Sequence, residues 1–118
     1  MNSFDFKKRT AVITGGAQGF GLDIAKRFLN SGATVFIWDI DEDLLKKVTN
    51  EINNPNLIYK KVDVSNFKEV ETTVSEITSK FNIDILINNA GITGPTATLW
   101  DYDTKMWNKI VEINLMGT

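Results

Sequence analysis

The feature that most constrains the fold is a glycine-rich turn between Thr14 and Gly21, near the amino terminus of the 118-residue chain. The turn follows a short apolar run and precedes apolar residues at helical spacing, so it is predicted to join a buried strand to a helix. There, Gly15 allows a tight turn, Gly19 lets a pyrophosphate approach the backbone, and Gly21 permits close helix–strand packing. Because the start of a helix also attracts phosphate, the sequence predicts a nucleotide-binding turn. It lacks the Gly-Lys-Ser/Thr ending of a P-loop.

Strand and helix patterns alternate along the chain. Apolar runs predict strands over 10–14, 34–38, 57–62 and 83–87, and the more polar third run favours a place near a sheet edge. The helix boundaries are predicted from capping residues: Gly32 closes the first helix, Asp41 or Asp43 caps the second, Ser65 caps the third, and the last begins near Asp103 or Thr104. The expected fold is a doubly wound, parallel α/β Rossmann sheet with strand order 3-2-1-4, and residues 1–118 form one dinucleotide-binding unit.

Apolar residues at helical spacing predict the buried face of each helix. The residues expected to face the core are Ile24, Ala25, Phe28 and Leu29, then Leu44, Leu45, Val48 and Ile52, then Val70, Val74, Ile77 and Phe81, and finally Trp107, Ile110, Val111 and Leu115.

Composition excludes several functions. The net charge of −2 carries no basic excess for nucleic acid. The chain has no cysteine and no histidine, so disulfides, the commonest transition-metal ligands and the usual general base are missing, and no metal site is expected. No apolar run approaches the roughly 20 residues that span a bilayer, so no membrane partner and a cytoplasmic location are expected.

Asp39 lies 18 positions beyond Gly21, at the end of the second predicted strand. A carboxylate there can accept hydrogen bonds from both ribose hydroxyls of an adenosine, and it would repel a 2′-phosphate. No arginine stands beside it, so NAD is favoured over NADP. The alternative for Asp39 is a solvated turn residue.

The spacing Thr-Gly-x-x-x-Gly-x-Gly resembles the short-chain dehydrogenase/reductase family. Three further matches follow in order: Asp63-Val64, the loop from Asn88 to Gly91, and Asn114 in the last helix. The resemblance implies that Asp63 and Val64 contact adenine, that the loop lies beside the cofactor, and that Asn114 helps to position a catalytic water and lysine. The implied cofactor-binding residues are Gly15, Gln18, Gly19, Phe20, Gly21, Asp39, Ile40, Asp63, Val64, Asn89, Ala90 and Gly91, and the implied catalytic residue is Asn114.

Each matching piece also has a purely structural interpretation. Asp63 could cap a strand end, and Asn114 could mark a helix irregularity because asparagine competes with helical backbone bonds. Asn88 could tie neighbouring strands together through its amide, in which case Asn89 would face the cofactor.

The family's catalytic pair, a tyrosine and a lysine four residues later, is missing. Tyr59 is followed at that spacing by Asp63, and Tyr102 by Met106. Because the chain ends inside what should be the fifth helix, we expect a truncated enzyme, inactive by itself. The alternative is a self-standing nucleotide-binding module.

The resemblance implies an NAD(H)-dependent oxidoreductase that moves a hydride between nicotinamide and an alcohol or carbonyl substrate. Residues 94–102 look like those of 3-oxoacyl-carrier-protein reductases or of sugar and sugar-acid dehydrogenases. The alternatives are a non-catalytic NAD-binding module and a remnant that acts only by self-association. A homo-oligomer is expected, because the apolar fourth strand would form a sheet edge.

Overall fold

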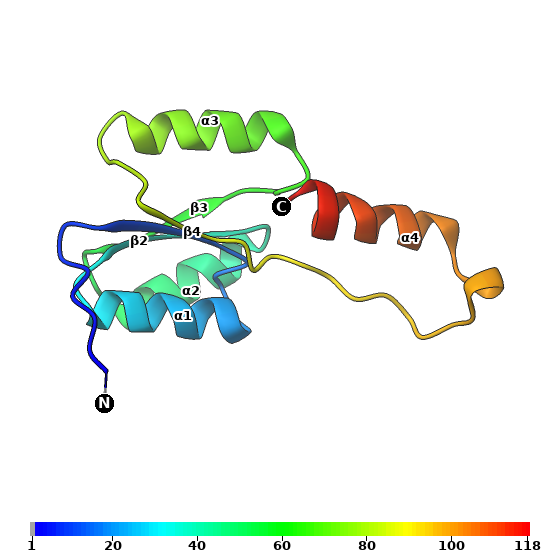
Figure 1. The fold of residues 1–118 in the computed structure, drawn as a ribbon, viewed down its shortest axis with the longest axis horizontal. Helices are drawn as coiled ribbons and strands as arrows, with labels where there is room; N and C mark the ends of the chain where they lie inside the picture. Colours follow the sequence, from blue (N-terminus) through cyan, green and yellow to red (C-terminus); the bar gives the residue numbers. More distant parts are fainter. Residues whose placement is uncertain (1) are drawn as a thin grey trace.

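The computed structural model describes residues 2–118 and forms a parallel sheet with the order β3-β2-β1-β4 (Figure 1). The strands are β1 (Thr10–Thr14), β2 (Thr34–Asp39), β3 (Leu57–Lys61) and β4 (Ile85–Ile87). Helices α1 (Gly19–Asn30) and α2 (Glu42–Ile52) cover one face of the sheet, α3 (Phe67–Thr78) covers the other, and α4 (Thr104–Val111) stands beyond the carboxyl ends of the strands. The predicted doubly wound fold is confirmed.

The two central strands hold the sheet together because both of their faces are buried. They pair in register from Thr10 opposite Thr34 to Thr14 opposite Trp38. Ile13 and Ile37 pack against α1 and α2, whereas Phe36 and its neighbours pack toward α3. Burial on both sides explains why these strands read as continuous apolar runs.

The edges of the sheet are less regular. The third strand lies at an edge, as predicted, and its middle residues are half-buried. The fourth covers Ile85–Ile87 rather than 83–87, because Asp84 turns to the neighbouring strand: its carboxylate accepts the Thr10 N–H at 2.9 Å and pairs with Arg9 at 3.3 Å. At this second edge the Leu86 side chain is 55% exposed.

The predicted cap of α2 is confirmed, but that of α3 is wrong. The Asp41 carboxylate accepts the Leu44 N–H at 3.0 Å. Asn66, not Ser65, caps α3 by accepting the N–H groups of Lys68 and Glu69, because the hydroxyl and N–H of Ser65 donate to the Asp63 carboxylate. The side chain nearer the turn thus serves the preceding loop, and the next residue caps the helix.

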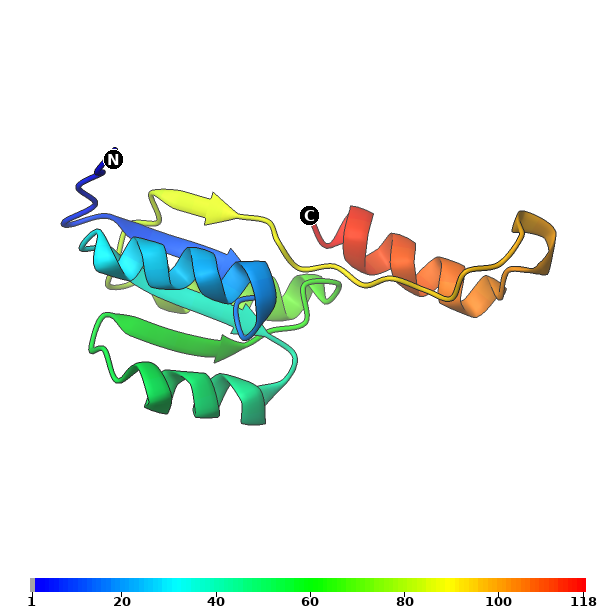
Figure 2. The ribbon, with the colours of Figure 1, turned by 90° about the horizontal axis from the view of Figure 1, so that it is seen from below.

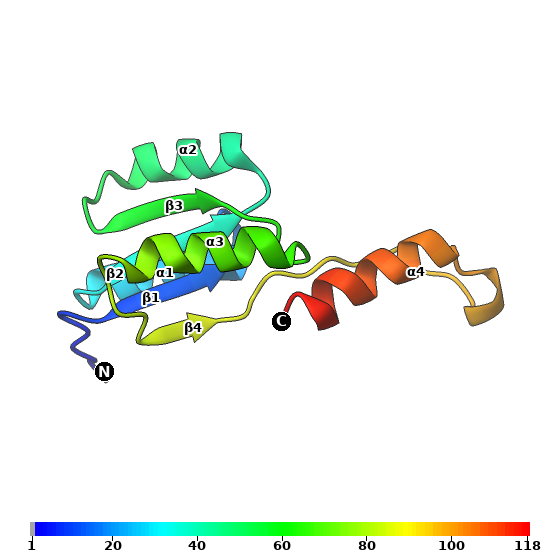
Figure 3. The same ribbon diagram turned by 90° about the horizontal axis from the view of Figure 1, so that it is seen from above.

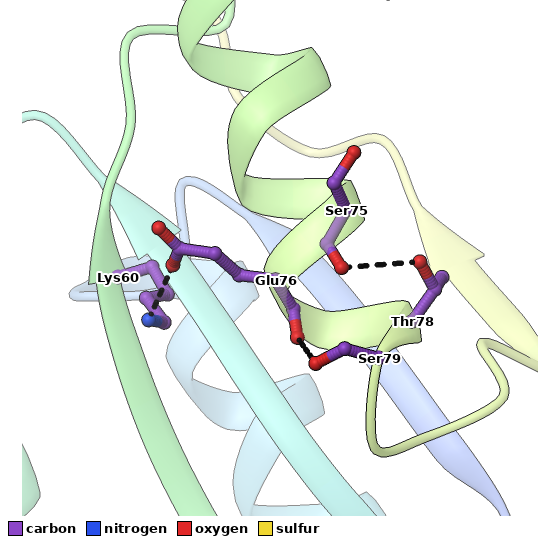
Figure 4. A network of polar contacts seen from close by, with 5 residues as sticks. All are labelled: Lys60, Ser75, Glu76, Thr78 and Ser79. Atoms are coloured by element: carbon purple, nitrogen blue, oxygen red, sulfur yellow. Dashed lines mark hydrogen bonds and ion pairs between the residues drawn. The ribbon is translucent and has the colours of Figure 1, made fainter.

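The carboxyl end of α3 is fastened to the edge strand (Figure 4). Glu76 pairs with Lys60 of β3 at 2.9 Å, and its carbonyl accepts the Ser79 hydroxyl at 2.7 Å. The Ser79 side chain thus satisfies a carbonyl near the helix end, where backbone partners run out, and the hydroxyl of Thr78 donates to the Ser75 carbonyl at 3.4 Å. Phe81, predicted within this helix, follows its end and still packs edge-on against Phe36, with ring centroids 5.4 Å apart.

The segment after β4 runs away from the sheet, and α4 returns toward it, ending in a π-helical turn over Glu112–Met116 (Figures 2 and 3). The inward orientation predicted for Trp107, Val111 and Leu115 is wrong, because this helix lies beyond the strand ends instead of over a sheet face; all three are exposed, while Ile110 is half-buried. It is also the fourth α-helix of the described residues, not the fifth. No helix within 2–118 is long and apolar enough to cross a membrane.

Candidate functional site

The glycine turn needs glycine at different positions for different reasons. Gly15 and Gly19 have positive φ values of +63° and +56°, a region that side chains rarely adopt. A Cβ on Gly21 would collide with the carbonyl oxygen of Gly15, so the start of α1 packs directly against the turn. A Cβ on Gly19 would meet nothing within 4 Å in the described part of the chain. The turn is therefore tight on its inner side and open at Gly19.

The start of α1 is left free for an anion. The N-cap residue, Gln18, makes no side-chain capping bond, and the first turn of the helix carries no acidic residue within the described chain. By contrast, side chains cap α2, α3 and α4. The first N–H groups of α1 and the positive end of its dipole thus remain available to a phosphate.

Asp39 joins the end of β2 to the glycine turn. Its carboxylate accepts the N–H of Ala17 at 3.3 Å and that of Asp41 at 3.2 Å, and the neighbouring Trp38 carbonyl accepts the Gly16 N–H at 3.0 Å. These bonds hold a half-buried carboxylate beside the turn, where it can accept further hydrogen bonds.

Hydrogen bonds hold the loop after β4 against the glycine turn. The Thr14 hydroxyl oxygen accepts the N–H groups of Asn89 and Ala90, both at 3.0 Å. The Asn89 amide donates to the carbonyls of Thr14 and Gly15, also at 3.0 Å. The tie between strands suggested for Asn88 is therefore made by Asn89, because the strand ends at Ile87 and the chain folds over the end of β1; Asn88 is exposed.

A cavity of about 940 Å³ lies between the carboxyl ends of the strands and α4. Most of the predicted binding residues meet there: Gly15, Gln18, Asp39, Ile40, Asp63, Val64, Asn89, Ala90 and Gly91. The rest of the predicted set, Gly19, Phe20 and Gly21, forms the first turn of α1, and the Phe20 side chain is 82% exposed. The fold brings the predicted residues to one end of the sheet, where α/β proteins bind their ligands.

The sequence interpretation missed the wall that α4 contributes. This wall consists of Lys105, Asn108, Lys109, Glu112 and Ile113. Their spacing of three and four residues is the signature of one helical face, and it could have been read from the sequence. The sequence interpretation instead took the apolar residues of this helix as the side that faces the rest of the protein.

Two further residues of the predicted set, Asp63 and Asn114, also have structural partners. The Asp63 carboxylate accepts the N–H and hydroxyl of Ser65, at 2.9 and 2.6 Å, so it closes the loop before α3. The Asn114 amide binds Ile92 in both directions: it accepts the N–H at 2.8 Å and donates to the carbonyl at 2.9 Å. Asn114 lies within the π-helical turn, as the irregularity interpretation expected, and π-turns are frequent at functional sites.

The groups around the cavity fit an adenine dinucleotide. Free N–H groups at the start of α1 suit a pyrophosphate, and the Asp39 carboxylate suits ribose hydroxyls. Within residues 2–118 no group of three or more potential metal ligands lies together.

Comparisons with known proteins agree with this geometry. A sequence model of the family described as short chain dehydrogenase matches residues 9–118. The 2-dehydro-3-deoxy-L-rhamnonate dehydrogenase (NAD(+)) of a Sphingomonas species is 34% identical over 110 residues, which cover 92% of this chain and 43% of that protein.

Two crystal structures of proteins from Brucella melitensis have similar folds. One is a short-chain dehydrogenase/reductase designated glucose/ribitol dehydrogenase, with a TM-score of 0.91 and 31% identity, covering 98% of this chain and 50% of that one. The other is a 3-ketoacyl-(acyl-carrier-protein) reductase complexed with NADH, with a TM-score of 0.89 and 34% identity, covering 96% of this chain and 47% of that one.

The chain spans half or less of the length of each of these relatives. The family match over residues 9–118 spans the glycine turn, the residues that line the cavity, and α4. The chain therefore belongs to the short-chain dehydrogenase family, whose members are oxidoreductases.

Proposed function

We propose that this chain forms the NAD(H)-binding part of an oxidoreductase that transfers a hydride between nicotinamide and an alcohol or carbonyl carbon. The observation that carries the proposal is the uncapped start of α1, which follows the glycine turn beside a cavity that Asp39 also lines. A dinucleotide needs both groups: N–H donors for its phosphates and an acceptor for its ribose.

In this proposal each part of the site has a separate task. The first turn of α1 binds the pyrophosphate, and Asp39 accepts the ribose hydroxyls and repels a 2′-phosphate. Asp63, Val64 and the loop from Asn89 to Gly91 border the rest of the nucleotide. When bound, the cofactor supplies the hydride acceptor or donor, while these residues bind and orient it.

The proton transfer that accompanies hydride transfer requires a group that titrates near neutral pH. Neither tyrosine of this chain has a lysine four residues later, so we propose that the 118-residue chain does not catalyse the reaction by itself. Asn114 is the member of the family's catalytic set that it carries. The substrate class, a sugar-acid or an acyl carbonyl compound, is a proposal from the resemblance of residues 94–102.

A second candidate is a chain that functions by associating with its own copies. It is favoured by the free edge at β4, where Leu86 is 55% exposed, and by the exposed Trp107 and Leu115 of the last helical segment. Both roles can coexist, because these residues are not among those that line the cavity.

The cofactor proposal is tested by titrating NADH and NADPH into the purified chain and into Asp39→Ser. The chain should bind NADH more tightly than NADPH. The variant should bind NADH roughly ten- to a hundredfold more weakly, since a charge-assisted hydrogen bond contributes roughly 1.5–3 kcal/mol, and should bind NADPH better because a repulsive charge is gone.

Asp41→Asn is the matched control, since Asp41 also lines the cavity but caps α2. It should leave the preference for NADH unchanged. Absence of binding to either nucleotide, or equal binding of both by the unaltered chain, would contradict the proposed cofactor.

A further inference from the structure

The charges around the cavity are unfavourable for an anionic ligand on the side of the sheet. Among the described residues that line it, the sheet side carries the carboxylates of Asp39, Asp41 and Asp63. A dinucleotide brings two phosphate charges into this surrounding. The dipole of α1, equivalent to roughly half a positive charge, offsets part of the repulsion.

The opposite wall carries compensating charge, because its two lysines outnumber its single carboxylate, that of Glu112. Lys105 and Lys109 of α4 are the lysines among the lining residues of the described chain. Neither takes part in any of the ion pairs found within residues 2–118. Both ammonium groups are therefore available to a ligand in the cavity.

The spacing of the two lysines is unfavourable for the helix alone. Like charges four residues apart lie on the same helical face and destabilise a helix by a few tenths of a kcal/mol. An anion bound between them and the sheet would remove that repulsion. The helix also holds a defined position, because Asn114 bonds to both backbone groups of Ile92.

From this arrangement we infer that Lys105 and Lys109 form a second wall of the nucleotide site and attract the phosphates of the cofactor from the side opposite α1. The inference rests on the proposed function and adds specificity-determining residues to it. It makes α4 a part of the binding site as well as a structural element.

The test compares Lys105→Met/Lys109→Met with the unaltered chain by calorimetric titration of NADH, ADP-ribose and adenosine. Methionine keeps much of the length of the side chain and removes the charge. We expect NADH and ADP-ribose to bind about tenfold more weakly at low salt, since two partly exposed charge contacts are lost. The difference should shrink at high salt because of screening, and adenosine, which has no phosphate, should bind as before.

Lys26→Met/Lys47→Met is the matched control. It removes the same net charge from exposed positions of α1 and α2 that do not line the cavity, and it should change NADH affinity less than twofold. Equal NADH binding by the unaltered chain and the α4 variant would overturn this inference while leaving the proposed function in place. Equal weakening of adenosine would also overturn it. If the unaltered chain binds no NADH, the proposed function fails, and the inference fails with it.

Discussion

At Gly21 and Gly19 the same amino acid meets two different demands. Gly21 is buried, and the carbonyl of Gly15 occupies the place of its missing side chain, so the demand there is steric. Gly19 has open space around it but a φ of +56°, so the demand is conformational and concerns access to the backbone. A glycine motif thus contains positions that preserve the fold and positions that preserve binding.

Exchanging each glycine for alanine should separate these demands. Gly21→Ala forces α1 away from the turn and should lower the free energy of unfolding by about 2–4 kcal/mol, as other overpacked or strained sites do. Gly19→Ala should cost about 1 kcal/mol for the left-handed backbone but should abolish most NADH binding, because its Cβ covers the exposed turn. Denaturant unfolding and NADH titration measure both effects. Similar stability of the two variants would contradict this division.

At the scale of elements, the sequence predicts secondary structure best where both faces of an element are buried. The apolar runs of β1 and β2 are enough to predict these two strands, because both of their faces are covered. The cap of α3 was predicted at Ser65 but lies at Asn66, since both side chains can accept N–H bonds and the loop at Asp63 decides between them. Whether Asn88 or Asn89 binds the turn likewise depends on the residue at which β4 ends.

The orientation of α4 is the larger failure, and it has a tertiary cause. Its apolar residues have helical spacing, which predicts an amphipathic helix but does not say which surface the apolar side meets. Here it is the polar side that meets the cavity. The residues on the sheet side of the cavity could thus be predicted from motifs that follow the strands. The wall formed by α4 could not, because it depends on where the chain places that helix.

The position of α4 should depend on Asn114. Asn114→Ala removes both bonds to Ile92, each contributing about 0.5–1.5 kcal/mol, and should raise hydrogen exchange in α4 about tenfold, leaving α2 unchanged. Asn114→Asp keeps the acceptor and loses the donor, so its exchange should be intermediate. Unchanged protection of α4 in the alanine variant would show that other contacts fix the helix.

At the scale of the whole molecule, both β4 and the last helical segment carry exposed apolar side chains. Leu86, Trp107 and Leu115 are 55%, 49% and 69% exposed, and β4 leaves the backbone groups of its outer side unpaired within the described sheet. Such edges are templates for pairing with another chain, and apolar surface of this kind favours association. None of these three residues lines the cavity between the strand ends and α4, so association through them need not close it.

Introducing positive charge at Leu86 and Leu115 should therefore prevent copies of the chain from associating. We expect the unaltered chain to sediment above its monomer mass of 13.3 kDa at micromolar concentration, and Leu86→Lys/Leu115→Lys to sediment as a monomer, because a lysine on an edge strand or in an apolar contact disfavours pairing. Phe67→Lys is the control: it alters an apolar residue that is 77% exposed, at the start of α3, and should associate as the unaltered chain does. A monodisperse monomer for the unaltered chain would refute self-association, while dissociation of the Phe67 variant would mean that overall charge, not this surface, governs it.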